Sequence, residues 1–227
     1  RGTVPAGDAR APLPQLAPGH HLLELFHGPT LAFRDSAPQL LGQLFPLALA
    51  PSAHRVTIPV ADSHLTGAAV LAAFRGLPNV DVFIMYPHGR VSEVQRRQMS
   101  TPADANVHAL AVDGTFDDCQ ARLKDLFNDH GFRDAVGLAG VNSINWARVA
   151  AQIVYYFKGY FAATRSNDEQ IAFSVPSGNF GNICAGHIAR QMGLPVARLI
   201  LATNENDVLD EFFRSGVYRP RKAAETH

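Results

Sequence analysis

The clearest local signal in this sequence is SVPSGNFGN, residues 174–182. They end an apolar run that begins at Ile171, and a helical pattern follows them, so a strand enters a turn rich in Gly and Asn and a helix leaves it. Gly178 and Gly181 allow the backbone to approach a ligand closely. The N–H groups and positive dipole end of the next helix point at this turn, so it is a candidate phosphate site. The alternative is an ordinary strand–helix turn.

Strands and helices alternate on both sides of this turn. Short apolar runs predict strands around 57–62, 80–87, 106–114, 171–178 and 197–203. Helical patterns lie between them, around 66–75, 91–99, from 115 onward, 146–161 and 183–192. Because each strand is apolar almost throughout, we expect an α/β fold with a parallel sheet covered on both faces.

Composition narrows the class of protein. The chain has 227 residues, of which 47% are hydrophobic, enough for a packed core. Its 20 Lys and Arg balance its 20 Asp and Glu, which gives no electrostatic reason to expect nucleic acid or a membrane surface as a partner. Cys119 and Cys184 lie far apart, so neither a metal site nor a disulfide framework is expected.

The ends of the chain carry little pattern. Residues 1–20 are rich in Pro, Gly and Ala and predict an irregular segment, without the apolar centre of a signal peptide. No run of 18 apolar residues occurs. We therefore expect a cytoplasmic protein. The missing initiator Met and the polar end, 217–227, suggest a piece of a longer protein.

A second segment, 23–42, holds an HGPT turn followed by a helical stretch. Arg34 stands there beside Asp35, and by residue chemistry alone the two form a surface ion pair of little energetic value. Pro38 would break a hydrogen bond inside a helix, so the helix begins near Pro38 or is kinked there.

Two further segments carry polar groups beside apolar helices. In 87–100, Arg96 and Arg97 can hold a phosphate or carboxylate by paired hydrogen bonds, or they form a solvated basic face. In 141–157, Asn142 or Ser143 is expected to cap the next helix. Asn145 and Arg148 either satisfy loop backbone or face a ligand.

Together these segments resemble one family. ELFHGPTLAF, YPHGRVSEVQRRQM, VDGTFDDCQ, NSINWARVAAQIVYYF, SVPSGNFGN and ATNENDVLDEFF, in this order, are similar to threonine synthase, from Leu22 to Tyr218. The resemblance implies a parallel-sheet fold of the pyridoxal-phosphate fold type II class, similar to the tryptophan synthase beta subunit and truncated at both ends. Residues 21–227 would be an incomplete enzyme core, with 55–165 the smaller subdomain. The implied reaction converts O-phospho-L-homoserine and water to L-threonine and phosphate.

The resemblance also implies roles for particular residues. The Schiff-base lysine of the family falls at Arg34. Cofactor contacts would come from a loop containing Ser63 and Thr66, and substrate contacts from Thr66, Ser92, Arg97 and Asn145. The cofactor phosphate would lie against Gly178, Asn179, Phe180, Gly181 and Asn182.

Arg34 separates the hypotheses about activity. An arginine stays protonated and is a poor nucleophile, so it cannot replace the lysine that binds the cofactor and moves protons. Each power of ten lost in rate corresponds to about 1.4 kcal/mol of barrier. His64 and Leu65 also replace a Gly and an Asp of the family's cofactor loop. Three hypotheses follow. The chain is a threonine synthase, or it is an inactive homologue or remnant that binds pyridoxal phosphate without a covalent link or binds a phosphorylated amino acid. The third is a remnant that folds poorly and has no biochemical role.

Overall fold

The structure, a computed structural model, describes residues 11–31, 33–49, 54–62, 66–141 and 145–221. The chain divides into two compact units, Arg1–Arg148 and Val149–His227. This boundary lies inside the segment 55–165, so the predicted smaller subdomain stays a prediction. Each unit is described by itself below.

The first unit contains a parallel sheet in the order β3–β4–β5, formed by Val56–Ala61, Val80–Pro87 and Val107–Val112. Its register pairs Val60 with Ile84, and Ile84 with Ala109. β3 and β5 are the two edge strands, and the edge position of β3 tolerates Pro59 within the strand. β4 therefore occupies the centre, where both of its sides are hydrogen-bonded.

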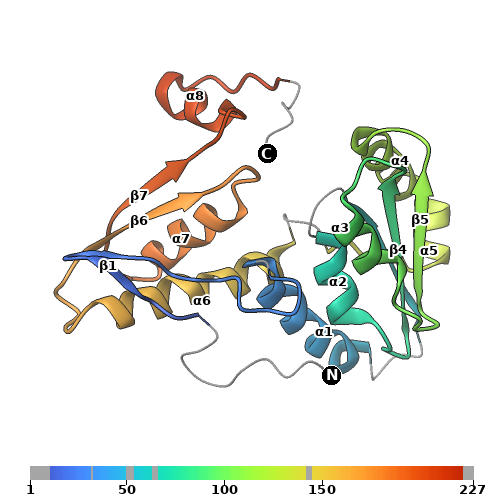
Figure 1. Cartoon of the computed structure of the whole chain (residues 1–227), viewed down its shortest axis with the longest axis horizontal. Helices are drawn as coiled ribbons and strands as arrows, with labels where there is room; N and C mark the ends of the chain where they lie inside the picture. The colour runs from blue at the N-terminus through green and yellow to red at the C-terminus, as the bar shows by residue number, and fades with distance from the viewer. Residues whose placement is uncertain (1–10, 32, 50–53, 63–65, 142–144, 222–227) are drawn as a thin grey trace. The chain divides into compact units, whose positions relative to one another are not determined.

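Helices connect these strands. α2 follows β3, α3 follows β4 and α4 follows β5, with α1 before the sheet and α5 after it, as Figure 1 shows. The helices span Ser36–Leu49 (α1), Thr66–Phe74 (α2), Glu93–Ser100 (α3), Phe116–Asn128 (α4) and His130–Ala135 (α5). Because α1 begins at Ser36, Pro38 lies in its first turn, where the missing N–H costs little. The prediction that the helix begins near Pro38 is confirmed.

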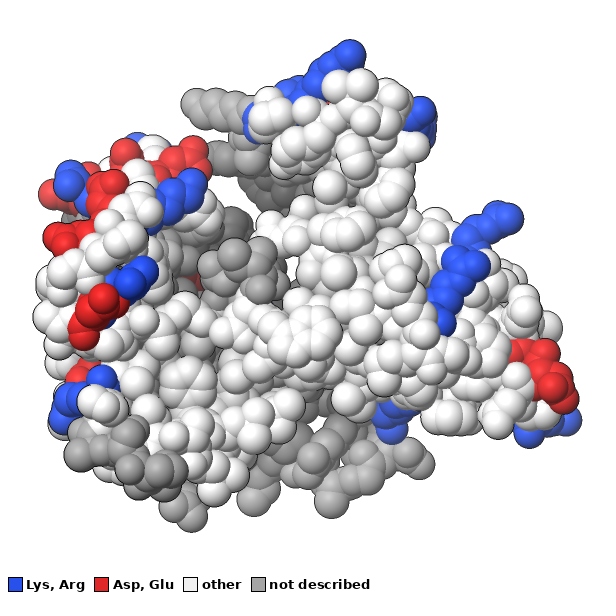
Figure 2. Space-filling view, turned by 180° about the vertical axis from the view of Figure 1, so that it is seen from behind, with Lys and Arg blue, Asp and Glu red and all other residues white. Residues whose placement is uncertain are grey.

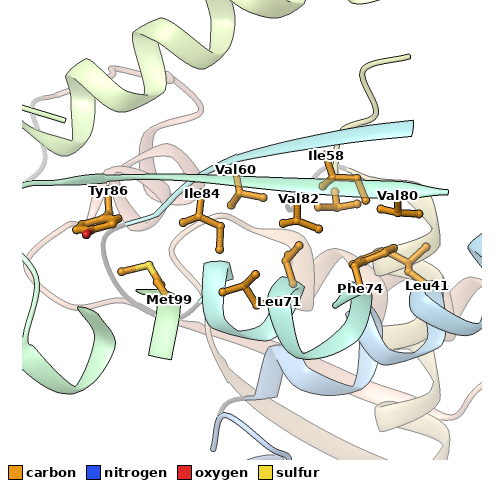
Figure 3. Packing of buried hydrophobic residues seen from close by; sticks show 12 residues of the cluster. Leu41, Ile58, Val60, Leu71, Phe74, Val80, Val82, Ile84, Tyr86 and Met99 are labelled. Atoms are coloured by element: carbon orange, nitrogen blue, oxygen red, sulfur yellow. The ribbon is translucent and has the colours of Figure 1, made fainter. Parts of the chain in front are cut away.

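The core of this unit lies between the sheet and helices α1, α2 and α3 (Figure 3). Alternate residues of β4 supply its centre: Val80, Val82 and Ile84 point from the sheet toward Leu71 and Phe74 of α2. Asn106 closes one end of this layer, because its side-chain amide donates to the carbonyl oxygens of Phe74 (3.0 Å) and Val80 (2.8 Å).

The second unit contains most of α6 (Trp146–Ala163), then β6 (Ile171–Pro176), α7 (Gly181–Gln191), β7 (Val196–Ala202) and α8 (Val208–Ser215). β6 and β7 pair in parallel, and α7 connects them. Half-buried or exposed residues make up most of both strands. The expectation of a sheet covered on both faces is therefore wrong for this pair within the described residues.

Two more corrections concern short elements. β1 (Gln15–Ala17) and β2 (His20–His21) form an antiparallel hairpin, so the segment expected to be irregular over 1–20 contains a strand. Residues 130–135 and 208–215 form α5 and α8, which the sequence pattern did not predict. In Figure 2, acidic and basic side chains are mixed at the left of the face shown, and most of the middle of that face carries neither. No described helix is both long enough and apolar enough to cross a membrane.

Candidate active-site segments

The turn between β6 and α7 is built to leave the start of a helix open. The N–H of Ser177 donates to the carbonyl oxygen of Ala202 (3.1 Å), which continues the β6–β7 pairing into the turn. Phe180 then adopts a left-handed conformation (φ 62°) as the N-cap of α7, and its side chain caps no N–H group. The first N–H groups of α7 therefore lack a capping side chain and suit an anion.

Asn182 anchors the first turn of α7 to α6. The hydroxyl of Tyr156 lies 2.8 Å from the carbonyl oxygen of Asn182 and 2.9 Å from its Oδ1. Burial raises the pKa of Tyr156, so its hydroxyl stays protonated and donates to these acceptors. Asn182, predicted as a cofactor contact, therefore also has a structural role.

A hollow of about 400 Å³ opens beside the turn, at the edge where β6 and β7 end. This is where open parallel sheets bind ligands. Its walls include Gly178 and Asn179 of the predicted phosphate turn. The other lining residues come from the β7–α8 loop and the segment after α8: Asn204, Glu205, Asn206, Asp207, Val208, Leu209, Tyr218 and Arg221.

Sequence reasoning missed the β7–α8 loop as part of a site. ATNEND, 202–207, belongs to the motifs that resemble threonine synthase, but we assigned it no role. The signal was available, because the loop follows a parallel strand directly and must reach the same edge as the β6–α7 turn. In the structure, Asp207 accepts a hydrogen bond from Arg221 (2.9 Å), so this side of the hollow holds a paired charge.

The side chain of Asp35 holds the HGPT turn, residues 27–30, in place. The carboxylate of Asp35 accepts from the backbone N–H of Thr30 (2.9 Å) and from its hydroxyl. A Cβ at Gly28 would lie 2.7 Å from the Cγ of Asp35, so only glycine fits there. Arg34 lies between these groups in a 3-10 turn, η2 (Phe33–Asp35), and its side chain is outside the described structure.

Asp35 corrects one sequence expectation. It is only 2% exposed, so it is not half of a surface ion pair. The hydrogen bonds that Asp35 accepts hold the turn before residue 34. Because they are buried, each of them contributes more to stability than a surface ion pair would.

The β3–α2 turn has a similar construction. Asp62 is buried, and its carboxylate accepts from the N–H of Gly67 (2.7 Å), which secures the start of α2. Ser63, His64 and Leu65 lie outside the described residues, as does the side chain of Thr66. Their assignment as cofactor and substrate contacts stays a prediction.

Ser92 begins α3 with a capping box. Its hydroxyl accepts from the N–H of Gln95 (3.3 Å), while the side-chain oxygen of Gln95 accepts from the N–H of Ser92 (3.2 Å). Arg96 (2.7 Å) and Arg97 (2.8 Å) both pair with Glu93. Hydrogen bonds from these guanidinium groups lower the pKa of Glu93 to about 2. The negative charge of Glu93 therefore balances part of the positive charge of the predicted basic pair, Arg96 and Arg97.

Asn145 caps α6. Its Oδ1 accepts from the N–H of Ala147 (2.9 Å), and its Nδ2 donates to the carbonyl oxygen of Gly140 (2.8 Å). Asn142 and Ser143, which we expected to cap this helix, lie outside the described residues. Arg148 is buried and donates to the carbonyl oxygen of Val141 (2.9 Å), so it satisfies loop backbone.

The predicted site residues fall into both units. Arg34, Thr66, Ser92, Arg97 and Asn145 belong to Arg1–Arg148, and the turn at 178–182 belongs to Val149–His227. Within the second unit, the structure brings the predicted phosphate turn together with the β7–α8 loop around one hollow. Among the described residues, no three His, Cys, Asp or Glu side chains are grouped to hold a metal ion.

The fold has clear relatives among solved structures. Maize serine racemase superposes with a TM-score of 0.58 over 85% of this chain at 16% identity, which shows a shared fold. Pyridoxal-phosphate-bound threonine synthase from Brucella melitensis superposes with a TM-score of 0.89 at 50% identity, covering 95% of this chain and 46% of that one. The chain thus has the architecture of the fold type II pyridoxal-phosphate-dependent enzymes.

Within that class, the sequence is similar to threonine synthases. The threonine synthase of Methylobacillus glycogenes is 57% identical over 207 residues, which are 91% of this chain and 44% of that protein. That of Pseudomonas aeruginosa is 54% identical over 94% of this chain and 45% of its own length. No family profile matches. The predicted resemblance to threonine synthase is confirmed, and the chain spans slightly less than half the length of these relatives.

Proposed function

We propose that this chain is the pyridoxal-phosphate-binding portion of a threonine-synthase-like protein, with the cofactor phosphate at the β6–α7 turn. One observation carries the proposal: the turn presents an uncapped helix start beside a hollow at the ends of two parallel strands. The residues fit a phosphate, because Gly178 has open space around it and no side chain caps α7. When bound, pyridoxal phosphate would supply an electron sink for chemistry at an amino acid.

The proposed substrate is O-phospho-L-homoserine, converted with water to L-threonine and phosphate. Similarity to threonine synthases supports this reaction class. Arg97 would bind the substrate phosphate by exchanging Glu93 for the incoming anion, next to Ser92 at the start of α3. Asn145 would contact the substrate through the second N–H of its amide or the second lone pair of its Oδ1, because each atom has one backbone partner. A cytoplasmic location remains a prediction from the sequence.

Arg34 favours a second form of this function, binding without turnover. The HGPT turn that carries the family's lysine is intact, since Gly28, Thr30 and Asp35 hold it by packing and hydrogen bonds. The residue presented by that turn is an arginine, which cannot attach the cofactor covalently or act as a base near neutral pH. We therefore propose that the chain holds the cofactor non-covalently.

The test compares the chain with Arg34→Lys. We expect pyridoxal phosphate to bind the unmodified chain and to be removed by dialysis, with no attachment after borohydride reduction. Arg34→Lys should give a visible absorbance band, and reduction should leave the cofactor on the peptide that contains residue 34. Arg133→Lys, which adds a lysine on the exposed α5, is the matched control and should behave like the unmodified chain.

Two results would overturn these proposals separately. Release of phosphate from O-phospho-L-homoserine by the unmodified chain, with formation of threonine, would contradict binding without turnover. Failure of both the chain and Arg34→Lys to bind the cofactor, although both show a cooperative thermal transition, would contradict the proposed phosphate site.

A further inference from the structure

Helix α8 is tied to the phosphate turn by an aromatic contact. The rings of Phe180, the N-cap of α7, and Phe213, on α8, stack with centroids 5.9 Å apart and planes inclined by 25°. Phe212 places its ring edge-on to Phe213 (5.4 Å) and to Tyr218 (6.2 Å). Both helices follow strands that end at the same edge, α7 after β6 and α8 after β7 (Figure 1).

The backbone of Phe180 has a strained conformation that this aromatic contact can stabilise. Among the described non-glycine residues, only Leu31 and Phe180 have positive φ. A bulky residue adopts the left-handed region at a steric cost, so surrounding contacts must hold it there. No side-chain hydrogen bond caps α7 at this point, and the ring of Phe180 is the part that reaches another element. The conformation of Phe180 in turn sets the direction of the first N–H groups of α7.

Two arginines hold α8 and the segment that follows it together. Arg219 donates to Glu211 (3.0 Å), and Arg221 donates to Glu211 (2.7 Å) and to Asp207 (2.9 Å). Tyr218 and Arg221 also line the hollow beside the phosphate turn. Phe213 is nevertheless 60% exposed, so it adds little to a buried core, and its ring is available for a role other than stability.

We infer that Phe213 is a positioning residue: its ring holds Phe180 in the left-handed conformation that sets the direction of the first N–H groups of α7. This inference rests on the proposed function, in which that helix start binds the cofactor phosphate. Phe213 touches the turn and acts on the anion through Phe180. The β7–α8 region is therefore a working part of the phosphate site.

The first experiment measures affinity for inorganic phosphate and for pyridoxal phosphate. We expect Phe213→Ala to weaken both by about fivefold, the scale of one aromatic pair. Phe213→Tyr keeps the ring and should retain the original affinity. Phe161→Ala is the matched control, because Phe161 is also 60% exposed and lies on α6, where its ring contacts Phe157 and Tyr160. It should leave both affinities unchanged.

A double-mutant cycle separates positioning from general damage. Glycine adopts the left-handed region without steric cost, so Phe180→Gly removes the need for the supporting ring. Adding Phe213→Ala to Phe180→Gly should then change phosphate affinity by less than about twofold. A full additional loss in the double variant would overturn the inference.

A ligand-free measurement keeps the inference testable if the phosphate proposal fails. The N–H of Cys184 donates to the carbonyl oxygen of Phe180 (2.9 Å), so its hydrogen exchange reports the geometry of the N-cap. We expect faster exchange at Cys184 in Phe213→Ala and no change in Phe161→Ala. Unchanged exchange in Phe213→Ala would overturn the positioning role. Absence of phosphate binding by the unmodified chain would instead overturn the proposed function.

Discussion

Single buried carboxylates hold the two turns that resemble the cofactor-facing segments of the family. Asp35 binds the backbone and hydroxyl of Thr30, and Asp62 binds the N–H of Gly67. Each aspartate packs closely against a glycine. A Cβ at Gly28 or Gly67 would lie 2.7 Å from an atom of the nearby aspartate side chain, so a larger residue would clash there. The framework around residue 34 is thus kept by side-chain chemistry at neighbouring positions. The departure at Arg34 changes the reactive group without removing that support.

Glu93 controls the charge of α3. Its carboxylate binds both Arg96 and Arg97, and these hydrogen bonds lower its pKa to about 2 from an ordinary value of 4.5. Since the folded-state pKa is depressed, the stabilising effect is complete above pH 4.5 and is lost as the pH falls through about 2. The pairing therefore persists throughout the neutral range, and lowering the pH to 5 does not release the arginines.

The substitution Glu93→Gln should release the guanidinium groups of Arg96 and Arg97 at neutral pH. Without the carboxylate, both guanidinium groups are available to an anion, so we expect inorganic phosphate to bind α3 about threefold more tightly, the scale of exposed charge pairs. Chemical-shift titration of the arginine Nε groups measures this. Asp117→Asn makes the same charge change on α4 and should have little effect. Equal gains in the two variants would mean that net charge, and not release of the pair, is responsible.

Among the helices and strands, hydrophobic periodicity predicted the elements whose apolar side chains pack in a core. Apolar runs predicted β3, β4, β5, β6 and β7 because their own side chains carry the signal. α5 and α8 were missed: α5 has six residues, and none of them is buried. A short helix without buried residues leaves no apolar stripe to find, and this explains α5. α8 does carry a stripe, because Val208 and Leu209 lie one turn from Phe212 and Phe213, so its signal was present in the sequence.

The candidate site could be predicted only in part, for a related reason. The glycines and asparagines of 178–182 are visible in sequence, and the structure gives them an open helix start. The conformation of Phe180 and its contact with Phe213 could not be predicted, because the two residues are far apart in the chain and meet only when β6 and β7 pair. The capping role of Asn145 depends likewise on where α6 begins.

The packing of α6 on α7 depends on Gly186. A Cβ there would lie 2.6 Å from the Cζ of Tyr156 and 3.0 Å from the Cδ2 of Leu199. We expect Gly186→Ala to destabilise the protein by about 1–3 kcal/mol, the usual cost of overpacking, as measured by urea unfolding. It should also displace the Tyr156 hydroxyl from Asn182 and so disturb the first turn of α7.

Gly178→Ala is the control for this prediction. Gly178 lies in the same unit, and a Cβ there would meet nothing within 4 Å. Its stability should stay within about 0.5 kcal/mol of the unmodified chain. If Gly186→Ala were equally well tolerated, the contact between α6 and α7 would not be as close as the structure has it.

At the scale of the whole molecule, the two units differ in how well their sheets are supported. β4 is paired on both sides and packed against α2, and Val82 and Ile84 are fully buried. In the described structure β7 pairs with β6 alone, and Ile200 is 44% exposed. Sheets of two strands gain little independent stability, so local opening should cost less in the second unit.

Hydrogen exchange at residue resolution tests this difference. We expect amides of 82–86 in β4 to exchange at least about tenfold more slowly than those of 197–201 in β7, because each factor of ten reflects about 1.4 kcal/mol of opening free energy. Gly186→Ala should speed exchange in β7 and leave β4 unchanged, since Leu199 borders the added methyl group. Equal protection of the two strands would mean that both units open in one cooperative step, and the proposed phosphate turn would then be as stable as the core around β4.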